Sequence, residues 1–319
     1  MSIFVPSIAS VSLTVILSSL IIFSLSSPIF TTTQGLNLNI AQQHGSASPK
    51  LNNQDLMFCS FNIQVFGKTK MSKADVVNVL LKILSECHVT FVMEVRDSTG
   101  SAIVDLLDKL NQYTNNTRSY RLQVSERLGR TSSKEQYAFI YDSIMAQISS
   151  TFQFPVQFDY FERPPFSVIL TNLKNSSFHQ QLFITGIHTS PKYAVQEIDH
   201  LFNVFQYYMP QQNTSKLVQT NWLVTGDFNA GCSYVRPSDW AKIRLRTDKN
   251  FEWLIKDDDD TMVKTNCPYD RFVMPKSRSL DISQYEVFPY SHKWNLSQSL
   301  AIEVSDHFPI RLLVKNWNR

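Results

Sequence analysis

From Leu56 onward, the chain alternates short apolar runs with longer segments in which apolar residues recur every three or four positions. The second pattern predicts amphipathic helices over residues 71–84, 101–111 and 192–209. The apolar runs predict strands over residues 56–63, 88–95, 136–142, 166–173, 181–189 and 222–230, and two short strands within residues 299–314 that flank the Ser305–His307 segment. Because several neighbouring strands have no helix between them, we expect an α/β fold with two packed sheets covered by helices.

The N-terminal part of the chain has a different composition. The first 49 residues contain no Lys, Arg, Asp or Glu, and residues 11–23 form an apolar run that is followed by SLSSP. This pattern predicts a signal peptide over residues 1–29, with an uncleaved signal anchor as the alternative. Residues 30–54 are polar and predict a flexible leader before a domain over residues 55–319. We expect stable membrane association only if the N-terminal segment stays uncleaved.

Other features of the sequence agree with secretion. Glycosylation sequons of the N-x-S/T type begin at Asn115, Asn175, Asn213 and Asn295. The cysteines, at positions 59, 87, 232 and 267, permit disulfides but leave three pairings open. The formal charge of +3 is compatible with a polyanionic substrate and does not by itself indicate one.

Polar side chains stand where predicted strands end. A single Asp or Asn at such a position is usually a turn former. Here five strand ends each carry a residue type suited to metal binding or proton transfer, and this coincidence favours one shared site. The residues at these ends are Asn62, Glu94, His188, Asp227 with Asn229, and Ser305 with Asp306 and His307.

The chemistry of this set is suited to phosphodiester hydrolysis. Two histidines, His188 and His307, can move protons near neutral pH, and Glu135 and Asp270 are carboxylates that could orient them. A divalent ion would stabilise charge on the phosphoryl oxygens while one histidine activates water and the other protonates the leaving oxygen. Hard oxygen ligands that suit Mg²⁺, Mn²⁺ or Ca²⁺ better than zinc are offered by Asn62, Glu94, Asp227, Asn229 and Asp306.

The chain resembles the deoxyribonuclease I family, and within it the deoxyribonuclease gamma branch. The matching runs follow one another in order and spacing from Leu56 to Val314, and they are SFNIQVFGKTKMS, FVMEVRDS, RLGRTSSKEQYAF, GIHTSP, GDFNAGCSYV, IRLRTD, NCPYDR and VSDHFPI. The resemblance implies a four-layered α/β/β/α sandwich with two mostly antiparallel sheets. It also implies a secreted, monomeric endonuclease that cuts double-stranded DNA with Mg²⁺ or Mn²⁺ and Ca²⁺, leaving 5′-phosphate ends.

The resemblance also implies a role for individual residues. The catalytic group comprises His188 supported by Glu135, and His307 supported by Asp270. The residues around the metal and the scissile phosphate are Asn62, Glu94, Asp227, Asn229 and Asp306. The residues in contact with the DNA backbone or minor groove are Arg96, Arg130, Arg163 and Tyr234.

The cysteines fall into two pairs by this comparison. Cys232 and Cys267 match the structural disulfide of the family, which would stabilise the fold by roughly 3–4 kcal/mol in the chain-entropy model. Cys59 and Cys87 lie in or beside core strands. We interpret them as buried free thiols, with a second disulfide as the alternative.

The sequence departs from the family pattern at several places. Ser133 stands where the pattern has a tyrosine that stacks in the minor groove, so we expect an altered grip on DNA. The acidic loop DDDDTMVKTNC, residues 257–267, is one residue shorter than the calcium-binding loop it resembles. This leaves structural calcium at Asp257–Asp260 and a solvated acidic turn as alternatives. The basic C-terminal tail typical of the gamma branch is missing, so attack on chromatin or membrane-coated DNA is not predicted. Phe166 replaces a small residue, and actin binding is therefore not predicted.

Two other functions stay open at this point. The first is a different phosphodiesterase or phosphatase on the same fold, for which the Cys232/Cys267 pair and the RLGR and IRLRTD runs would not be expected. The second is a catalytically inactive binding protein, which the retention of His188, His307, Glu135 and Asp270 argues against.

Overall fold

The computed structural model describes residues 52–115, 117–173, 180–211 and 215–319. The predicted signal segment, almost all of the predicted leader and the sequons at Asn175 and Asn213 lie outside these ranges, whereas Asn115 and Asn295 are exposed. No helix in the described ranges has both the length and the apolar character needed to cross a bilayer.

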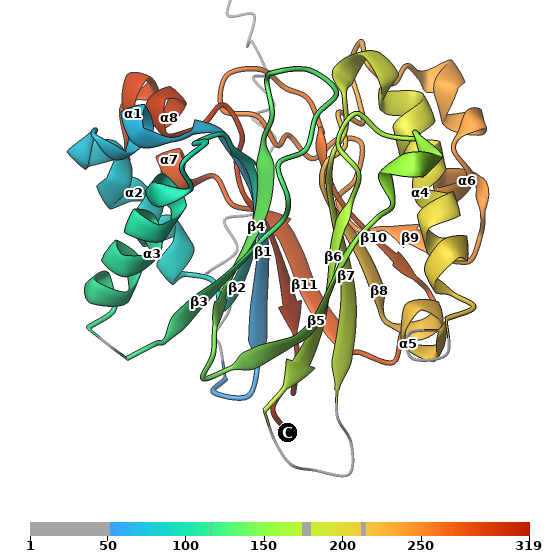
Figure 1. The fold of residues 1–319 in the computed structure, drawn as a ribbon, viewed down its shortest axis with the longest axis horizontal. Helices are drawn as coiled ribbons and strands as arrows, with labels where there is room; N and C mark the ends of the chain where they lie inside the picture. The colour runs from blue at the N-terminus through green and yellow to red at the C-terminus, as the bar shows by residue number, and fades with distance from the viewer. Residues whose placement is uncertain (1–51, 116, 174–179, 212–214) are drawn as a thin grey trace, which may run out of the picture. The chain divides into compact units, whose positions relative to one another are not determined.

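Two six-stranded sheets form the centre of the domain (Figure 1). The first has the order β11 (Ile282–Val287), β12 (Ile310–Val314), β1 (Leu56–Phe66), β2 (Val89–Val95), β4 (Gln136–Asp142) and β3 (Tyr120–Val124). The second has the order β5 (Ala146–Gln153), β6 (Phe166–Asn172), β7 (Gln181–His188), β8 (Trp222–Asp227), β10 (Asp270–Pro275) and β9 (Phe251–Trp253). Among the strand pairs of the described residues, only β1 with β2 and β7 with β8 are parallel, so the prediction of two mostly antiparallel sheets is confirmed.

Helices cover the outer face of each sheet (Figure 1). The first sheet is covered by α1 (Lys68–Met71), α2 (Ala74–Ser85), α3 (Ser101–Tyr113), α7 (Tyr290–Lys293) and α8 (Gln298–Val304). The second is covered by α4 (Ala194–Tyr208), α5 (Ser215–Thr220) and α6 (Arg244–Thr247), with 3-10 turns η1 (Val156–Phe158), η2 (Pro191–Tyr193) and η3 (Pro237–Lys242). Separate apolar clusters fill the space between the sheets and beneath each helical layer. This is the four-layered sandwich that the sequence predicts.

One predicted strand is a helix. Residues 298–304 form α8. Ser297 caps its N-terminus, and the Ser297 Oγ accepts a hydrogen bond from the Leu300 N–H over 3.3 Å. Ala301 and Val304, three residues apart, face the core together. A short apolar run does not distinguish a strand from a buried helical turn, and the serine cap favours the helix.

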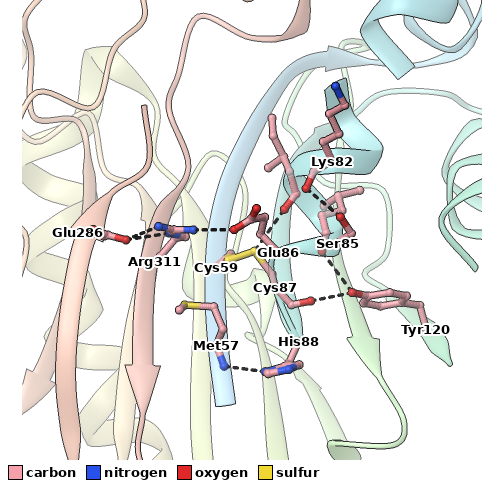
Figure 2. Close-up of a disulfide and its surroundings, with 12 residues drawn as sticks. Met57, Cys59, Lys82, Ser85, Glu86, Cys87, His88, Tyr120, Glu286 and Arg311 are labelled. Atoms are coloured by element: carbon pink, nitrogen blue, oxygen red, sulfur yellow. Dashed lines mark hydrogen bonds and ion pairs between the residues drawn. A yellow bond between two sulfur atoms is a disulfide. The ribbon is translucent and has the colours of Figure 1, made fainter. Parts of the chain in front are cut away.

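The interpretation of Cys59 and Cys87 as free thiols is wrong, because the two form a disulfide with a Cα–Cα distance of 6.0 Å. Figure 2 shows the bond between β1 and the segment that follows α2. The crossover through α2 returns the chain to β2, which lies parallel to β1, and so places Cys87 beside Cys59. Buried Met57 and Leu313 complete the surrounding cluster.

Candidate active site

Strand register assembles the site in the second sheet. His188, the last residue of β7, pairs with Asp227, the last residue of β8, and Asp227 pairs in turn with Asp270, the first residue of β10. Gly226 permits this approach, because its φ is +135° and a Cβ there would lie 1.8 Å from the carbonyl oxygen of Ile187. Three predicted site residues therefore lie side by side on three strands.

The first sheet contributes Asn62 and Glu94. Asn62 pairs with Met93 on β2, so Glu94 follows directly beside it. Glu94 has a φ of +60°, a strained conformation of the kind that clusters at functional sites. The Asn62 Nδ2 donates to Oε1 of Glu94 over 3.1 Å and to Oδ2 of Asp227 over 3.2 Å, and this amide therefore bridges the two sheets.

Two imidazoles face one carboxylate oxygen. The Nε2 atoms of His188 and His307 each lie 3.5 Å from Oδ2 of Asp227, and all three side chains are buried. His307 comes from the C-terminal part of the chain, where its N–H donates to Oγ of Ser305 over 3.0 Å. The Ser305 hydroxyl donates to the carbonyl oxygen of Asn62 over 2.6 Å, which fixes the two distant segments in one pocket.

Each histidine has its own buried carboxylate at Nδ1. Oε2 of Glu135 lies 3.3 Å from Nδ1 of His188, and Oδ2 of Asp270 lies 2.7 Å from Nδ1 of His307. A carboxylate at Nδ1 favours the proton on that nitrogen and leaves Nε2 directed at the pocket. The arrangement holds both rings in a fixed orientation.

The supporting carboxylates also change the charge state of the site. Burial alone would raise the pKa of Glu135, but contacts with His188 and Arg163 outweigh it and lower the pKa to about 2. Burial alone would lower the pKa of His307, but the carboxylates of Asp270 and Asp227 raise it to about 10. Burial also raises the pKa of Asp270, although its contact with His307 opposes this.

The carboxylates of the pocket fit a divalent cation. Burial raises the pKa of Asp306; His307 opposes this, and Glu94 and Asp227 raise it further. Within the described part of the chain, Oδ1 of Asp306 is buried without a hydrogen-bond partner. This oxygen lies 3.9 Å from Nε2 of His307. A carboxylate oxygen that lacks a hydrogen bond and lies near two other carboxylates is an arrangement that a hard cation stabilises.

Among the residues that the structure describes, two groups of side chains are close enough to share an ion, with one ligand atom from each residue within 4.8 Å of the others. They are Glu94, Glu135 and His188, and Asp227, Asp270 and His307. Among the predicted ligands, Asn229 is engaged in two hydrogen bonds. Its N–H donates to Oδ1 of Asp227 over 2.9 Å, and its Nδ2 donates to the carbonyl oxygen of Thr189 over 3.1 Å. This residue shapes the loop around Asp227 as well as lying near the pocket.

The predicted DNA-contacting residues occupy different environments. Arg96 lies at the pocket, where its Nη2 is 3.1 Å from Oε2 of Glu94. Tyr234 is 39% exposed, and its ring packs against Tyr269 at a centroid distance of 5.4 Å. Arg130 contacts the exposed Asp159 at 2.6 Å. Arg96 and Tyr234 therefore flank the site. Arg130 is tied by its ion pair to Asp159, in the loop after η1.

Arg163, predicted to contact DNA, is largely buried beside Glu135 and His188. Its Nη1 lies 2.7 Å from Oε1 of Glu135, and its side chain is 12% exposed. Its Nε donates to the carbonyl oxygen of His188 over 3.0 Å, and its Nη2 donates to that of Thr189 over 3.0 Å. The geometry gives this cation a positioning role toward Glu135 and His188.

Lys70 lies at the candidate site, although its residue type does not indicate this in the sequence. Its Nζ donates to the carbonyl oxygen of Ile63 over 2.8 Å and to that of Val304 over 2.7 Å, so it connects the segments that carry Asn62 and Asp306. Burial lowers its pKa to about 8, although Asp306 and Glu94 oppose this. Its position within the SFNIQVFGKTKMS run was the only available signal.

The second disulfide joins Cys232 and Cys267, with a Cα–Cα distance of 5.9 Å. It ties the loop after Asp227 to the segment that precedes Asp270. The pairing implied by the resemblance is thus present in the structure. Asp227 and Asp270, two of the three carboxylates around His307, therefore lie on segments that a covalent link joins in addition to strand pairing.

Comparison with known proteins defines the class of this chain. Residues 59–307 match the Endonuclease/Exonuclease/phosphatase family, and the chain belongs to it. Solved structures that share the fold include the human nocturnin catalytic domain with bound sulfate (TM-score 0.56, 11% identity, 83% of this chain and 94% of that chain). Another is TDP2 of D. rerio complexed with a single-strand DNA product (TM-score 0.54, 14% identity, 82% and 100%).

Sequence relatives narrow this class. Deoxyribonuclease gamma of Mus musculus is 36% identical over 272 residues, which cover 82% of this chain and 85% of the relative. Deoxyribonuclease-1 of Homo sapiens is 39% identical over 274 residues, which cover 82% and 92%. The chain is a member of the deoxyribonuclease I family, as the sequence analysis expects.

Proposed function

We propose that the chain is a secreted, metal-dependent endonuclease that hydrolyses phosphodiester bonds of double-stranded DNA and leaves 5′-phosphate ends. The relatives named above are deoxyribonucleases, which supports a deoxyribonuclease hydrolase. The observation that carries the proposal is the pair of Nε2 atoms, of His188 and His307, at equal distance from Asp227. Each ring is backed by a buried carboxylate, as acid/base catalysis requires.

The two histidines divide the proton transfers between them. A neutral imidazole accepts a proton at Nε2 from the attacking water, and an imidazolium donates one from Nε2 to the leaving oxygen. Glu135 and Asp270 hold each Nδ1–H and stabilise the charged form of their ring. Arg163 keeps Glu135 ionised and in place. The strand framework therefore fixes both rings before the substrate binds.

A metal ion would occupy the pocket of Glu94, Asp227 and Asp306, with Asn62 and Asn229 as neighbouring amides. We propose Mg²⁺ or Mn²⁺, because the donors are hard oxygens. The bound ion would supply electrostatic stabilisation of charge on the phosphoryl oxygens. Lys70 and Arg96 are the resident cations beside these carboxylates.

The acidic loop fits calcium less well than the sequence suggests. Asp257 contacts Arg246 at 2.6 Å and the fully buried Arg271 at 3.1 Å. Oδ1 of Asp260 accepts hydrogen bonds from the N–H groups of Met262 and Cys267. A calcium ion at this loop would have to compete with these contacts, so we propose it only as a weak structural ligand.

The remaining parts of the proposal concern the substrate and the compartment. Arg96, Arg130 and Tyr234 would contact the backbone or minor groove of duplex DNA, and such contacts are weakly sequence-selective. Two disulfides agree with an oxidising, extracellular compartment reached through the signal segment 1–29. We propose a monomer and do not propose actin binding.

Nicking of supercoiled plasmid tests the proposal. Secreted protein is incubated in Mg²⁺ with Ca²⁺, beside an EDTA control and the His188→Ala variant. We expect nicking by the wild-type protein and loss of nicking in both controls. Absence of nicking by a wild-type protein that is shown to be folded would overturn the proposal. Nicking that continues in EDTA would overturn its metal dependence.

A further inference from the structure

A basic hollow of about 580 Å³ lies beside the candidate active site, between η2, α4 and η3. We call it the η3 hollow. Its lining includes Lys192, Gln196, Tyr234, Arg236 and Lys242. These residues have no role in the acid/base or metal chemistry described above, so the positive charge of the hollow is not explained by catalysis.

Two tyrosines connect the wall of the hollow to the catalytic centre. Tyr234, in its wall, packs against Tyr269, and the Tyr269 ring lies 6.4 Å from that of His307 between centroids. On the other side, Lys192 follows His188 by four residues through the turn that begins η2. A ligand that reaches the catalytic histidines and extends past Tyr234 would therefore enter the hollow.

The cations of the hollow are directed to solvent. Arg236 and Lys242 have side chains that are 70% and 65% exposed, and both contact the same carboxylate, that of Asp239, which is 7% exposed. One buried carboxylate thus anchors two exposed cations, and their combined charge stays positive. Lys192 is exposed and lies over the ring of Tyr193 at 5.0 Å.

The other acidic group in the lining is already neutralised. Asp199 is bound by Arg244, whose Nη2 lies 2.8 Å away. With Asp199 and Asp239 both paired, the hollow presents a net positive field to solvent. Open grooves of this kind attract polyanions, and the backbone of duplex DNA carries one negative charge per about 1.7 Å of helix axis.

We propose that the η3 hollow is a second binding site for the DNA phosphate backbone, which holds the duplex beyond the scissile phosphate through Lys192, Arg236 and Lys242. This inference rests on the proposed function. The contacts are sequence-independent, because ammonium and guanidinium groups on phosphates carry no base information. Long duplexes therefore bind more tightly than duplexes that cover only the catalytic centre.

Fluorescence anisotropy with two duplexes tests this site. The parent is the His188→Ala variant in Mg²⁺, which prevents cleavage during the measurement. A triple variant of that parent carries Lys192→Gln, Arg236→Gln and Lys242→Gln. The matched control carries Lys109→Gln, which changes an exposed lysine on α3, in the helical layer that covers the other sheet. Each protein is titrated with a duplex of about 30 base pairs and one of about 8, from low to high salt.

We expect the triple variant to bind the long duplex roughly tenfold more weakly at physiological salt, with a salt slope reduced by about 2–3. Binding of the short duplex and binding by the Lys109→Gln control should match the parent. Unchanged affinity and slope for the long duplex, or equal loss for both duplexes, would overturn the inference alone. Failure of the parent to bind either duplex would overturn the proposed function together with it.

Discussion

Nδ1 of His307 lies 2.7 Å from Oδ2 of Asp270, and the Asp270 side chain has no exposed surface. No other ion pair of the described residues supplies Asp270 with a positive charge. Glu135, the equivalent support of His188, is held by Arg163 as well. The two histidine–carboxylate pairs, His307 with Asp270 and His188 with Glu135, should therefore differ in how much the histidine contributes to the stability of the fold.

We predict that His307→Ala loses both activity and stability, whereas His188→Ala loses mainly activity. Removing His307 leaves a buried carboxylate unpaired, which costs about 3 kcal/mol in the free energy of unfolding. Removing His188 leaves Glu135 paired with Arg163. Nicking rates should fall by about 10²-fold or more in both variants. Chemical denaturation of the two proteins in EDTA checks the difference.

The double variant His307→Ala/Asp270→Asn provides the control. The double variant removes the Asp270 charge, which the single variant leaves buried without a partner. Most of the lost stability should therefore return, while activity stays absent. Equal stability of the two single histidine variants, or no recovery in the double variant, would contradict the assigned difference.

His88, which lies away from the metal pocket, should make the stability of the fold depend on pH. Its Nδ1 accepts the Met57 N–H over 2.9 Å, which requires the neutral ring, and burial, assisted by Arg118, lowers its pKa to about 3 (Figure 2). The unfolded chain binds a proton below its ordinary pKa of 6.5, and the folded chain does not until about 3. The contribution of His88 is therefore complete above 6.5 and is lost as the pH falls toward 3. Between pH 6.5 and 5 the loss is about 2 kcal/mol.

The matched variant is His88→Gln, whose amide oxygen can accept the same N–H and does not titrate. Thermal unfolding at several pH values, with EDTA present, should give a smaller decrease of Tm toward pH 5 in this variant than in the wild type. Parallel curves would show that His88 does not carry the proton linkage.

The sequence indicated most of the strand framework, because most of the buried strands are short apolar runs that stop at a polar residue. Asn62, Glu94, His188 and Asp227 all stand at such stops, and the structure brings them together through strand register. The buried strand β10 instead begins at Asp270 and was not predicted from an apolar run. Residues 298–304 form a helix because a serine cap and two core-facing residues decide the conformation, and an apolar run of that length is compatible with either state.

Contacts between distant segments were harder to predict. Cys59 and Cys87 meet only because β1 and β2 are parallel neighbours, and sequence alone does not fix that adjacency. Lys70 acts through two backbone carbonyl groups, those of Ile63 and Val304, and such acceptors leave no mark on the residue types. The burial of Arg163 beside Glu135 could not be predicted either, because the sequence does not distinguish an arginine that contacts DNA from a buried one.

We predict that loss of either disulfide lowers stability, whereas loss of only one of them lowers activity. The two disulfides close segments of similar length, 28 and 35 residues, so replacing either pair by alanine should lower the free energy of unfolding by roughly 3–4 kcal/mol. Only Cys232–Cys267 ties the loop after Asp227 to Asp270. The Cys232→Ala/Cys267→Ala variant should therefore lose nicking activity at temperatures where it remains folded.

The Cys59→Ala/Cys87→Ala variant is the matched comparison for that measurement. Its disulfide is surrounded by Met57 and Leu313, and neighbouring Arg311 pairs with Glu86 and Glu286 (Figure 2). None of these residues belongs to the catalytic group. Its specific activity per folded molecule should equal that of the wild type, and a selective loss of activity here would contradict the prediction.

Ser133 predicts a gain of DNA affinity. It is exposed, two residues before Glu135, in the segment between β3 and β4. A tyrosine at this position would add a ring able to pack in the minor groove beside the catalytic group, where base–aromatic contacts contribute about 1–3 kcal/mol. Ser133→Tyr should lower KM for long duplex DNA by several-fold with little change in kcat. Ser132→Tyr, at the exposed neighbouring position, is the matched control. Because the ring must be directed at the duplex to act, an equal decrease of KM in both variants would indicate a general effect of surface aromatic residues and would contradict a specific stacking position at Ser133.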